Sequence, residues 1–218
     1  MCYYPVNLDV QDKDCLVVGG GSVGERKVRT LLECGARVTV VTILATEGLH
    51  TLASEGRIDL KTRGYKPSDV EGTFLVIGAT DSEEINEKIS EDAARRGLLV
   101  NIADRPAACN FVLPAIVRQG ALLIAISTSN KSPAVARRIR QNLEEEFGPE
   151  YAVLLNLMGA IRQRLLAQAK SPEAHKHMFE RLLDQGLLEM IRDNRIKDVD
   201  SLLHNLLGKG YIWKELMR

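Results

Sequence analysis

Residues 15–27, CLVVGGGSVGERK, constrain the fold more than any other stretch of this 218-residue sequence. A short apolar run meets three consecutive glycines, and a segment of good helix formers follows directly. Gly19, Gly21 and Gly24 give the spacing G-x-G-x-x-G between a predicted strand and a predicted helix. In this context the glycines predict a tight turn, an open approach for a pyrophosphate, and close packing of helix against strand. The stretch therefore predicts a dinucleotide-binding βαβ unit.

Strand-like and helix-like segments alternate through the first half of the chain. Strands are predicted at 6–10, 15–19, 36–42, 58–61, 73–81 and 98–104. Helices are predicted between them at 22–34, 45–55 and 82–96. This order predicts an α/β fold with a Rossmann-like, doubly wound parallel sheet.

The pattern changes after FVLP at 111–114. One more strand is predicted at 121–127, and Ser132 followed by Pro133 marks the start of a helix. From Pro149 onward the sequence reads as helical. We therefore expect three parts, namely a Rossmann-like domain at 1–113, a small α+β segment at 114–148 and a helical C-terminal domain at 149–218.

Composition excludes several classes of protein. Lys+Arg and Asp+Glu both number 29, so a net charge of zero gives no reason to expect nucleic acid or an anionic membrane as partner. No apolar run reaches the ~18–20 residues that span a bilayer. The four cysteines are scattered and form no zinc motif, and the N-terminus lacks the features of a signal peptide. We expect a cytoplasmic protein without a resident metal.

The end of the second parallel strand carries no acidic residue for the ribose hydroxyls of a dinucleotide. Thr42 stands at that place, followed by Ile43 and Leu44. Thr42 can form a hydrogen bond but brings no charge, and no arginine adjoins it to suit a 2′-phosphate. The position alone does not decide between NAD and NADP, but the local charge offers a phosphate no partner, so we expect NAD.

The residues expected to contact the cofactor lie at the carboxyl ends of the strands and in the first helical turn. They are Gly19, Gly21, Ser22, Val23, Gly24, Thr42, Ile43, Leu44, Ala79, Thr80 and Asn101. Ser22 and Val23 would offer backbone N–H groups to the pyrophosphate. Asn101 would orient either the nicotinamide carboxamide or the local backbone.

Five ordered motifs together resemble the precorrin-2 dehydrogenase family, which also forms the N-terminal module of siroheme synthases. They are PVNL, CLVVGGGSVGERK, IGATD, NIAD and ISTSNKSPAVARRIR. The resemblance implies NAD-dependent oxidation of precorrin-2 to sirohydrochlorin. It also implies a homodimer formed through 114–148, and a standalone form without a methyltransferase half. Some members insert Fe²⁺ into the product, so chelation of Fe²⁺ or Co²⁺ stays open for this chain.

Asp104 matches the functional aspartate of that family. It closes the predicted strand 98–104, at the sheet edge where open α/β sheets bind ligands. A positioned carboxylate there could accept the proton released when a ring carbon is oxidised. The alternative is that Asp104 forms an ordinary turn with Arg105 and Pro106.

A polycarboxylate such as precorrin-2 requires local positive charge in a neutral chain. The stretch KSPAVARRIR at 131–140 contains four cations and no acid, and a hydroxyl-rich lead-in precedes it. Such donors at a helix N-terminus can bind carboxylates. The expected substrate contacts are Thr128, Ser129, Asn130, Lys131 and Arg137. The alternative is a solvated helix face that pairs with the acids at 144–146.

Two other functions stay open. One is a nucleotide-sensing regulatory Rossmann domain without catalysis, and the other is a ferrochelatase in which NAD plays little part. A sensor would be expected to keep an acidic ribose ligand where Thr42 stands. It would also not need Asp104 together with a basic, hydroxyl-rich helix start.

Overall fold

The computed structural model describes residues 3–167 and 172–218 of the chain. Two compact units make up the fold, Met1–Leu113 and Pro114–Arg218, and each has a hydrophobic core of its own. The boundary between them in the chain falls where the sequence pattern changes, within FVLP at 111–114. The further boundary expected between 148 and 149 stays a prediction.

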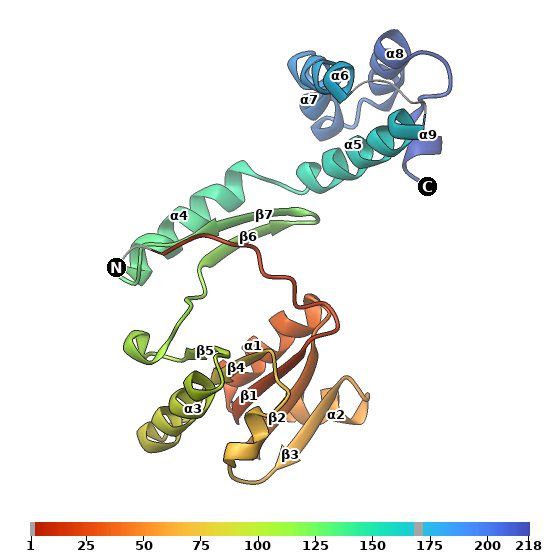
Figure 1. The fold of residues 1–218 in the computed structure, drawn as a ribbon. Helices are drawn as coiled ribbons and strands as arrows, with labels where there is room; N and C mark the ends of the chain where they lie inside the picture. Colours follow the sequence, from red (N-terminus) through yellow and green to blue (C-terminus); the bar gives the residue numbers. More distant parts are fainter. Residues whose placement is uncertain (1–2, 168–171) are drawn as a thin grey trace. The chain divides into compact units, whose positions relative to one another are not determined.

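The first unit is built on a five-stranded parallel sheet with the strand order β3-β2-β1-β4-β5 (Figure 1). Its strands are β1 (Asp14–Gly20), β2 (Arg37–Ala45), β3 (Ile58–Thr62), β4 (Leu75–Gly78) and β5 (Leu99–Ile102). β1 lies at the centre, and every residue from Cys15 to Gly20 is buried. The chain continues from β1 to β2 on one side and returns to β4 on the other. This reversal of strand order is where such sheets bind their ligands.

Helices cover both faces of this sheet. They are α1 (Ser22–Glu33), α2 (Glu47–Ser54) and α3 (Glu83–Arg95), and short 3₁₀ turns lie at Pro67–Val70 and Pro106–Ala108. Cys15 and Val17 of β1 pack into a core with α1 and α2, whereas Leu16 and Val18 pack into a second core with α3. Alternate residues of one strand are thus buried on opposite faces. The first unit is a doubly wound Rossmann-like fold, which confirms the expected fold class.

The strand predicted at 6–10 is wrong. Residues 3–10 adopt no regular secondary structure, and the side chains of Val6 and Leu8 are 68% and 43% exposed. Alternation of apolar and polar residues is necessary for a half-buried strand, but a strand also needs a partner edge. Pairing in the sheet begins at Asp14. Residues 6–10 therefore have no neighbouring strand in the sheet, and sequence periodicity does not reveal whether a partner strand exists.

The second unit begins with an antiparallel hairpin. Its strands are β6 (Ala115–Gln119) and β7 (Leu122–Ile126), and the turn between them contains Gly120 with φ +58°. The sequence predicted only the second of these strands. The first was missed because its sequence, AIVRQ, has only three apolar residues before a charged and a polar one, whereas the second, LLIAI, is apolar throughout.

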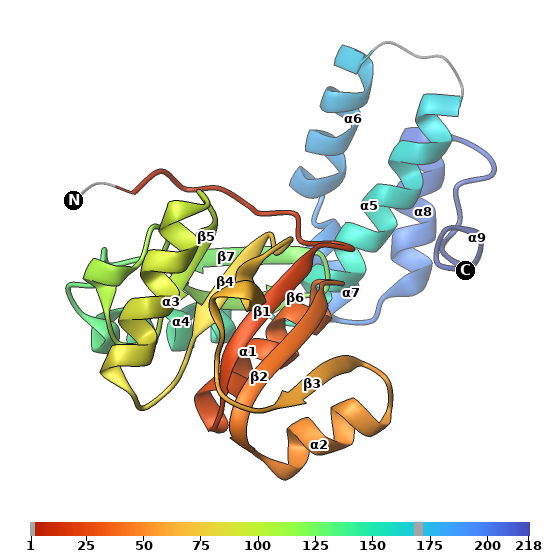
Figure 2. The same ribbon diagram turned by 60° about the horizontal axis from the view of Figure 1, so that its bottom comes forward.

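Helices make up the rest of the second unit. They are α4 (Pro133–Glu146), α5 (Glu150–Ala167), α6 (Pro172–Asp184), α7 (Leu187–Arg192), α8 (Ile196–Leu207) and α9 (Trp213–Leu216). Helices α5 to α9 lie together (Figure 2). They share a core that includes Leu157, Ile161, Leu187 and Leu203. The α+β segment and the helical region expected for this half are therefore confirmed. Among the described residues, no helix combines the length and the apolar character needed to cross a membrane.

Candidate functional site

The glycine loop brings the ends of β1 and β4 together with the start of α1. Gly19 has φ +115°, and a Cβ there would collide with the backbone carbonyl of Ala79. A Cβ on Gly24 would collide with the carbonyl oxygen of Gly19. Only glycine fits these two positions, and their packing allows the helix start to lie directly above the strand ends.

Gly21 is the N-cap of α1 and leaves the start of this helix open. No side chain caps the helix, and a Cβ built on Gly21 meets nothing within 4 Å. The N–H of Glu25 donates to the carbonyl of Gly21 at 2.9 Å, so the N–H groups before it have no intrahelical acceptor. Ser22 and Val23 are exposed. A pyrophosphate fits this cradle because it supplies the acceptors that the helix start lacks.

Gly20 joins the loop to the end of β2, and the sequence reasoning gave it no role. A Cβ on Gly20 would lie 2.5 Å from the Leu44 carbonyl oxygen and 2.7 Å from the Thr42 methyl carbon. Thr42 is only 8% exposed, and its hydroxyl donates to the Leu44 carbonyl at 2.7 Å. Thr42 therefore shapes the chain beside Gly20, and a contact with the cofactor stays a prediction. The available signal was the run of three consecutive glycines, of which Gly20 is the middle one.

Two apolar side chains follow Thr42. Ile43 is 72% exposed and Leu44 is 82% exposed, although both belong to β2. They lie where the adenosine part of a dinucleotide is bound in this fold. This end of β2 therefore offers apolar surface without charge, and the predicted cofactor contacts of both residues stay predictions.

The end of β4 lies beside Gly19 and is held by a buried amide. The N–H of Ala79 donates to the Val18 carbonyl at 2.7 Å. The Thr80 hydroxyl lies 2.9 Å from the amide oxygen of Asn86, and the Asn86 amide nitrogen donates to the Thr80 carbonyl at 2.8 Å. Asn86 is 5% exposed, and the sequence reasoning missed it. A polar residue on the buried face of an amphipathic helix was its one signal.

Asp104 occupies a left-handed turn directly after β5. Its φ is +60°, and the residue is exposed. The N–H of Arg105 donates to the Ile102 carbonyl at 3.3 Å, which closes the turn. Aspartate tolerates this conformation better than most residues. The turn and the functional role are therefore compatible, and the carboxylate is accessible at the carboxyl edge of the sheet.

The Cys109 thiol binds the backbone on both sides of Asp104. Its Sγ accepts a hydrogen bond from the N–H of Ile102 at 3.1 Å. The same Sγ lies 3.3 Å from the Ile102 carbonyl oxygen and 3.1 Å from that of Arg105, to either of which the thiol can donate. Burial raises the pKa of Cys109, so the thiol keeps the proton that it donates. The sequence reasoning missed this residue because a single cysteine after the aspartate forms no motif.

Two more side chains brace the same turn. Arg105 forms ion pairs with Glu83 and Glu87 of α3. The Asn101 amide nitrogen donates to the Phe111 carbonyl at 3.0 Å. This side chain therefore orients the local backbone, which is one of the two roles expected for it. The backbone around Asp104 is therefore held by Asn101 of β5, by the ion pairs of Arg105 with α3 and by the Cys109 thiol.

Lys27 links the glycine helix to Asp104 electrostatically. This lysine lies on α1 and is half-buried. Burial lowers the pKa of Lys27, the charge of Arg26 lowers it further, and the charge of Asp104 raises it. The influence of Asp104 is the smallest of these three. The sequence gave no signal for this pair, since Lys27 belongs to an ordinary helical pattern.

The hydroxyl-rich loop lies in the second unit, at the start of α4. Ser129 and Asn130 adopt left-handed conformations, with φ of +51° and +61°. The Thr128 hydroxyl accepts from the N–H of Ser132 at 3.3 Å. Ser132 in turn caps α4 by accepting from the N–H of Val135 at 3.3 Å. The loop is thus shaped by its own hydroxyl groups. The helix start that Ser132 and Pro133 predicted is confirmed.

The basic residues of this loop and helix differ in their partners. Arg140 forms an ion pair with Glu144, as the solvated-face alternative predicted. Lys131 and Arg137 are exposed, and neither forms an ion pair with a residue in 3–167 or 172–218. These two cations are therefore available to an external anion, and their contact with a substrate stays a prediction.

Comparisons with known proteins agree with this geometry. A family model described as putative NAD(P)-binding matches residues 6–115. The siroheme synthase of Methylococcus capsulatus is 36% identical over 203 residues, which cover 93% of this chain and 43% of that protein. The siroheme synthase of Vesicomyosocius okutanii is 34% identical over 208 residues, which cover 95% and 45%. The chain thus spans less than half the length of these curated relatives.

A solved structure gives the same fold. SirC, precorrin-2 dehydrogenase, superimposes with a TM-score of 0.80 and 24% sequence identity, covering 94% of this chain and 98% of SirC. The similarity to siroheme synthases that the five motifs indicated is confirmed. The glycine cradle lies within the region that the family model matches. The chain therefore belongs to the family of putative NAD(P)-binding domains, and its relatives include siroheme synthases.

Proposed function

We propose that this chain is an NAD-dependent dehydrogenase that oxidises precorrin-2 to sirohydrochlorin. The observation that carries the proposal is an open glycine cradle after β1 and the braced carboxylate of Asp104 after β5, both following the carboxyl ends of parallel strands in one sheet. The cradle suits a pyrophosphate, and the carboxylate suits proton removal. A domain that only sensed a nucleotide would not need a braced acid at this edge.

The proposed reaction removes a hydride and a proton from the tetrapyrrole. NAD⁺, when bound, supplies the hydride acceptor. The Asp104 carboxylate accepts the proton, which leaves the new double bond in the ring system. Cys109 and Arg105 hold the turn that carries this carboxylate. Such positioning lowers the barrier because the base does not have to be ordered during the reaction.

The cofactor contacts belong to the same proposal. The pyrophosphate is assigned to the N–H groups of Ser22 and Val23 in the cradle formed by Gly19, Gly21 and Gly24. The adenosine part is assigned to the end of β2 at residues 42–44, and the nicotinamide part to Ala79, Thr80 and Asn101. What supports this assignment is the position of all three groups at the carboxyl ends of neighbouring strands.

We assign the carboxylates of the substrate to the start of α4. Lys131 and Arg137 offer charges that no described acid neutralises, and the loop of Thr128, Ser129 and Asn130 offers hydroxyl and amide donors. Charged donors beside a helix N-terminus bind carboxylates strongly.

A homodimer formed through residues 114–148 completes the proposal. Of the residues of α4, Ala136 alone is buried, whereas Val135 and Ile139 are 50% and 39% exposed. Leu123 of β7 is 39% exposed as well. A two-stranded sheet with one helix rarely buries enough apolar surface alone. We therefore expect a second copy of the chain to cover these exposed apolar side chains. Light scattering should give the mass of a dimer, and a monomer at micromolar concentration would contradict this part.

Chelation is a separate step, in which Fe²⁺ or Co²⁺ would be a substrate. No group of three or more His, Cys, Asp or Glu side chains that could hold a metal ion occurs in the described part of the chain. Asp104 is the group that we assign to receive the pyrrole N–H protons if the chain chelates. We place the enzyme in the cytoplasm, where thiols such as Cys109 stay reduced.

Mixing the purified chain with precorrin-2 and NAD⁺ tests the proposal. We expect the absorbance of sirohydrochlorin and of NADH to appear together. Binding of NAD⁺ without any turnover would favour the nucleotide-sensing alternative instead. Adding Fe²⁺ or Co²⁺ to the product afterwards, with a chain-free control, decides whether the chain also chelates.

Cys109→Val should lower kcat by at least about tenfold, because valine fills the space of the thiol but makes neither of its hydrogen bonds. A displacement of a catalytic group by about 1 Å can cost about a hundredfold in rate. Steady-state kinetics should show an unchanged KM for NAD⁺, and Cys109→Ser should recover part of the rate. Cys34→Val, at the end of α1, is the control for loss of a thiol. A wild-type kcat in Cys109→Val would show that the hydrogen bonds of Cys109 do not contribute to the reaction.

A further inference from the structure

We propose that Glu25 determines the preference of this chain for NAD over NADP. The inference rests on the proposed dinucleotide binding and deepens it by naming the side chain that rejects a 2′-phosphate. Dinucleotide-binding units of this fold usually select the cofactor through an acid at the end of the second strand, which binds the ribose 2′-hydroxyl. In this chain the selecting charge comes from α1 instead.

The end of β2 cannot make the selection by itself. Thr42 is buried and its hydroxyl is already bound to the Leu44 carbonyl, while Ile43 and Leu44 are apolar. No charge at residues 42–44 would therefore repel or attract a phosphate on the 2′ position. The selection must come from a neighbouring element that reaches the same end of the strand.

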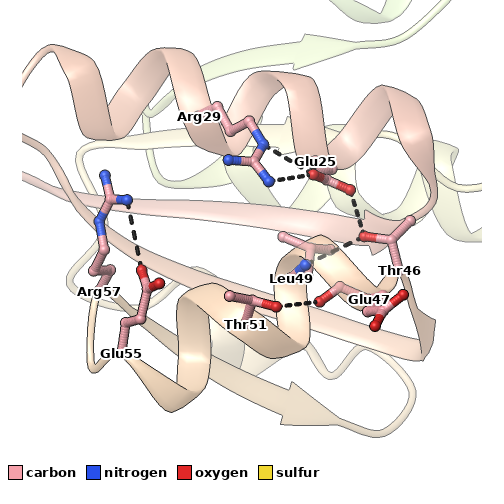
Figure 3. Close-up of polar contacts among 8 residues, drawn as sticks. All are labelled: Glu25, Arg29, Thr46, Glu47, Leu49, Thr51, Glu55 and Arg57. Atoms are coloured by element: carbon pink, nitrogen blue, oxygen red, sulfur yellow. Dashed lines mark hydrogen bonds and ion pairs between the residues drawn. The ribbon is translucent and has the colours of Figure 1, made fainter.

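Glu25 reaches that end from the first turn of α1 (Figure 3). Its Oε2 accepts a hydrogen bond of 2.6 Å from the hydroxyl of Thr46, the residue that follows β2 directly. Only 20% of the Glu25 side chain is exposed. The carboxylate is therefore fixed beside the junction of β2 and α2.

The same carboxylate occupies the start of α2. Thr46 is the N-cap of α2 and accepts from the N–H of Leu49 at 3.3 Å. A Cβ on Gly48, in the first turn, would collide with the Glu25 carboxylate. The positive end of this helix dipole thus already faces an anion that belongs to the protein. A 2′-phosphate brought to this junction would meet a like charge rather than an open helix start.

Arg29 is the cation at this place that could otherwise bind a phosphate, and Glu25 engages it. The Arg29 Nε and Nη2 donate to Glu25 Oε1 at 2.8 and 2.6 Å, as Figure 3 shows. The hydrogen bonds from Thr46 and Arg29 lower the pKa of Glu25, so the carboxylate stays charged at neutral pH. Glu25 therefore rejects the phosphate in two ways, by its own charge and by neutralising Arg29.

Direct binding measurements on Glu25→Gln test this role. Glutamine keeps the shape and an acceptor for Thr46, but it removes the charge and releases Arg29. Isothermal titration with NAD⁺ and with NADP⁺ should show that the wild-type chain prefers NAD⁺. In Glu25→Gln the affinity for NADP⁺ should rise by about tenfold, and the affinity for NAD⁺ should stay within about twofold. Arg29→Gln added to this variant should remove part of the gain.

Two matched variants separate charge from structure. Glu33→Gln removes the same charge from the exposed last residue of α1 and should change neither affinity. Thr46→Val loosens the same junction but keeps the carboxylate, so discrimination against NADP⁺ should persist. An unchanged NADP⁺ affinity in Glu25→Gln would overturn the inference while leaving the dehydrogenase proposal intact. Failure of the wild-type chain to bind either nucleotide would overturn both.

Discussion

Replacing Asp104 with asparagine should lower kcat for the proposed oxidation of precorrin-2 by about a hundredfold or more, whereas the Kd for NAD⁺ should stay within about twofold. Asparagine tolerates the left-handed turn and keeps the shape of the side chain. It cannot accept the proton that the ring must lose. Steady-state kinetics and direct titration with NAD⁺ measure the two quantities on the same preparation.

Asp12→Asn is the matched control for this substitution. Asp12 is also an exposed aspartate with positive φ in the first unit, but it precedes β1 and therefore lies at the opposite edge of the sheet. Its replacement should leave kcat unchanged. If Asp104→Asn turned over at nearly the wild-type rate, Asp104 would be only a turn residue.

Gly21→Val should weaken NAD⁺ binding by about a hundredfold, equivalent to ~2.7 kcal/mol. The backbone of Gly21, with φ −75° and ψ −178°, suits any residue, and a Cβ there meets nothing within 4 Å. The variant should therefore fold with an unchanged Tm. Its new side chain would fill the space in front of the α1 start that a pyrophosphate needs.

The glycine variants have their own controls. Gly64 also has open space around a Cβ, so Gly64→Val should change neither Tm nor the Kd for NAD⁺. Gly24→Val should instead lower Tm, since its Cβ would collide with the Gly19 carbonyl. Tight NAD⁺ binding by a folded Gly21→Val protein would show that the pyrophosphate lies elsewhere.

The sequence predicted the central part of the fold because short-range patterns carry that information. The apolar run of β1, the three glycines and the amphipathic α1 each have a local signature. Pairing has no such signature. VNLDV at 6–10 has the alternation of a strand but finds no partner in the sheet, and β6 pairs although its five residues show no period.

The candidate site was predictable only where one residue carries the chemistry. Asp104 and the glycines stand in motifs, so the sequence indicated them. Cys109 binds the backbone of Ile102, and Glu25 binds the hydroxyl of Thr46. No sequence motif marks either pairing. For Thr42 the sequence gave a possible hydrogen bond but not its partner, which is the Leu44 carbonyl two residues away.

One assay shows whether the glycine cradle and Asp104 serve a single oxidation. The purified chain is mixed with precorrin-2 and excess NAD⁺, and the absorbance of sirohydrochlorin and of NADH is followed in one cuvette. We expect equal amounts of the two products, formed at the same rate, and a loss of both in Asp104→Asn. Binding of NAD⁺ with no NADH formed in the presence of precorrin-2 would contradict this expectation.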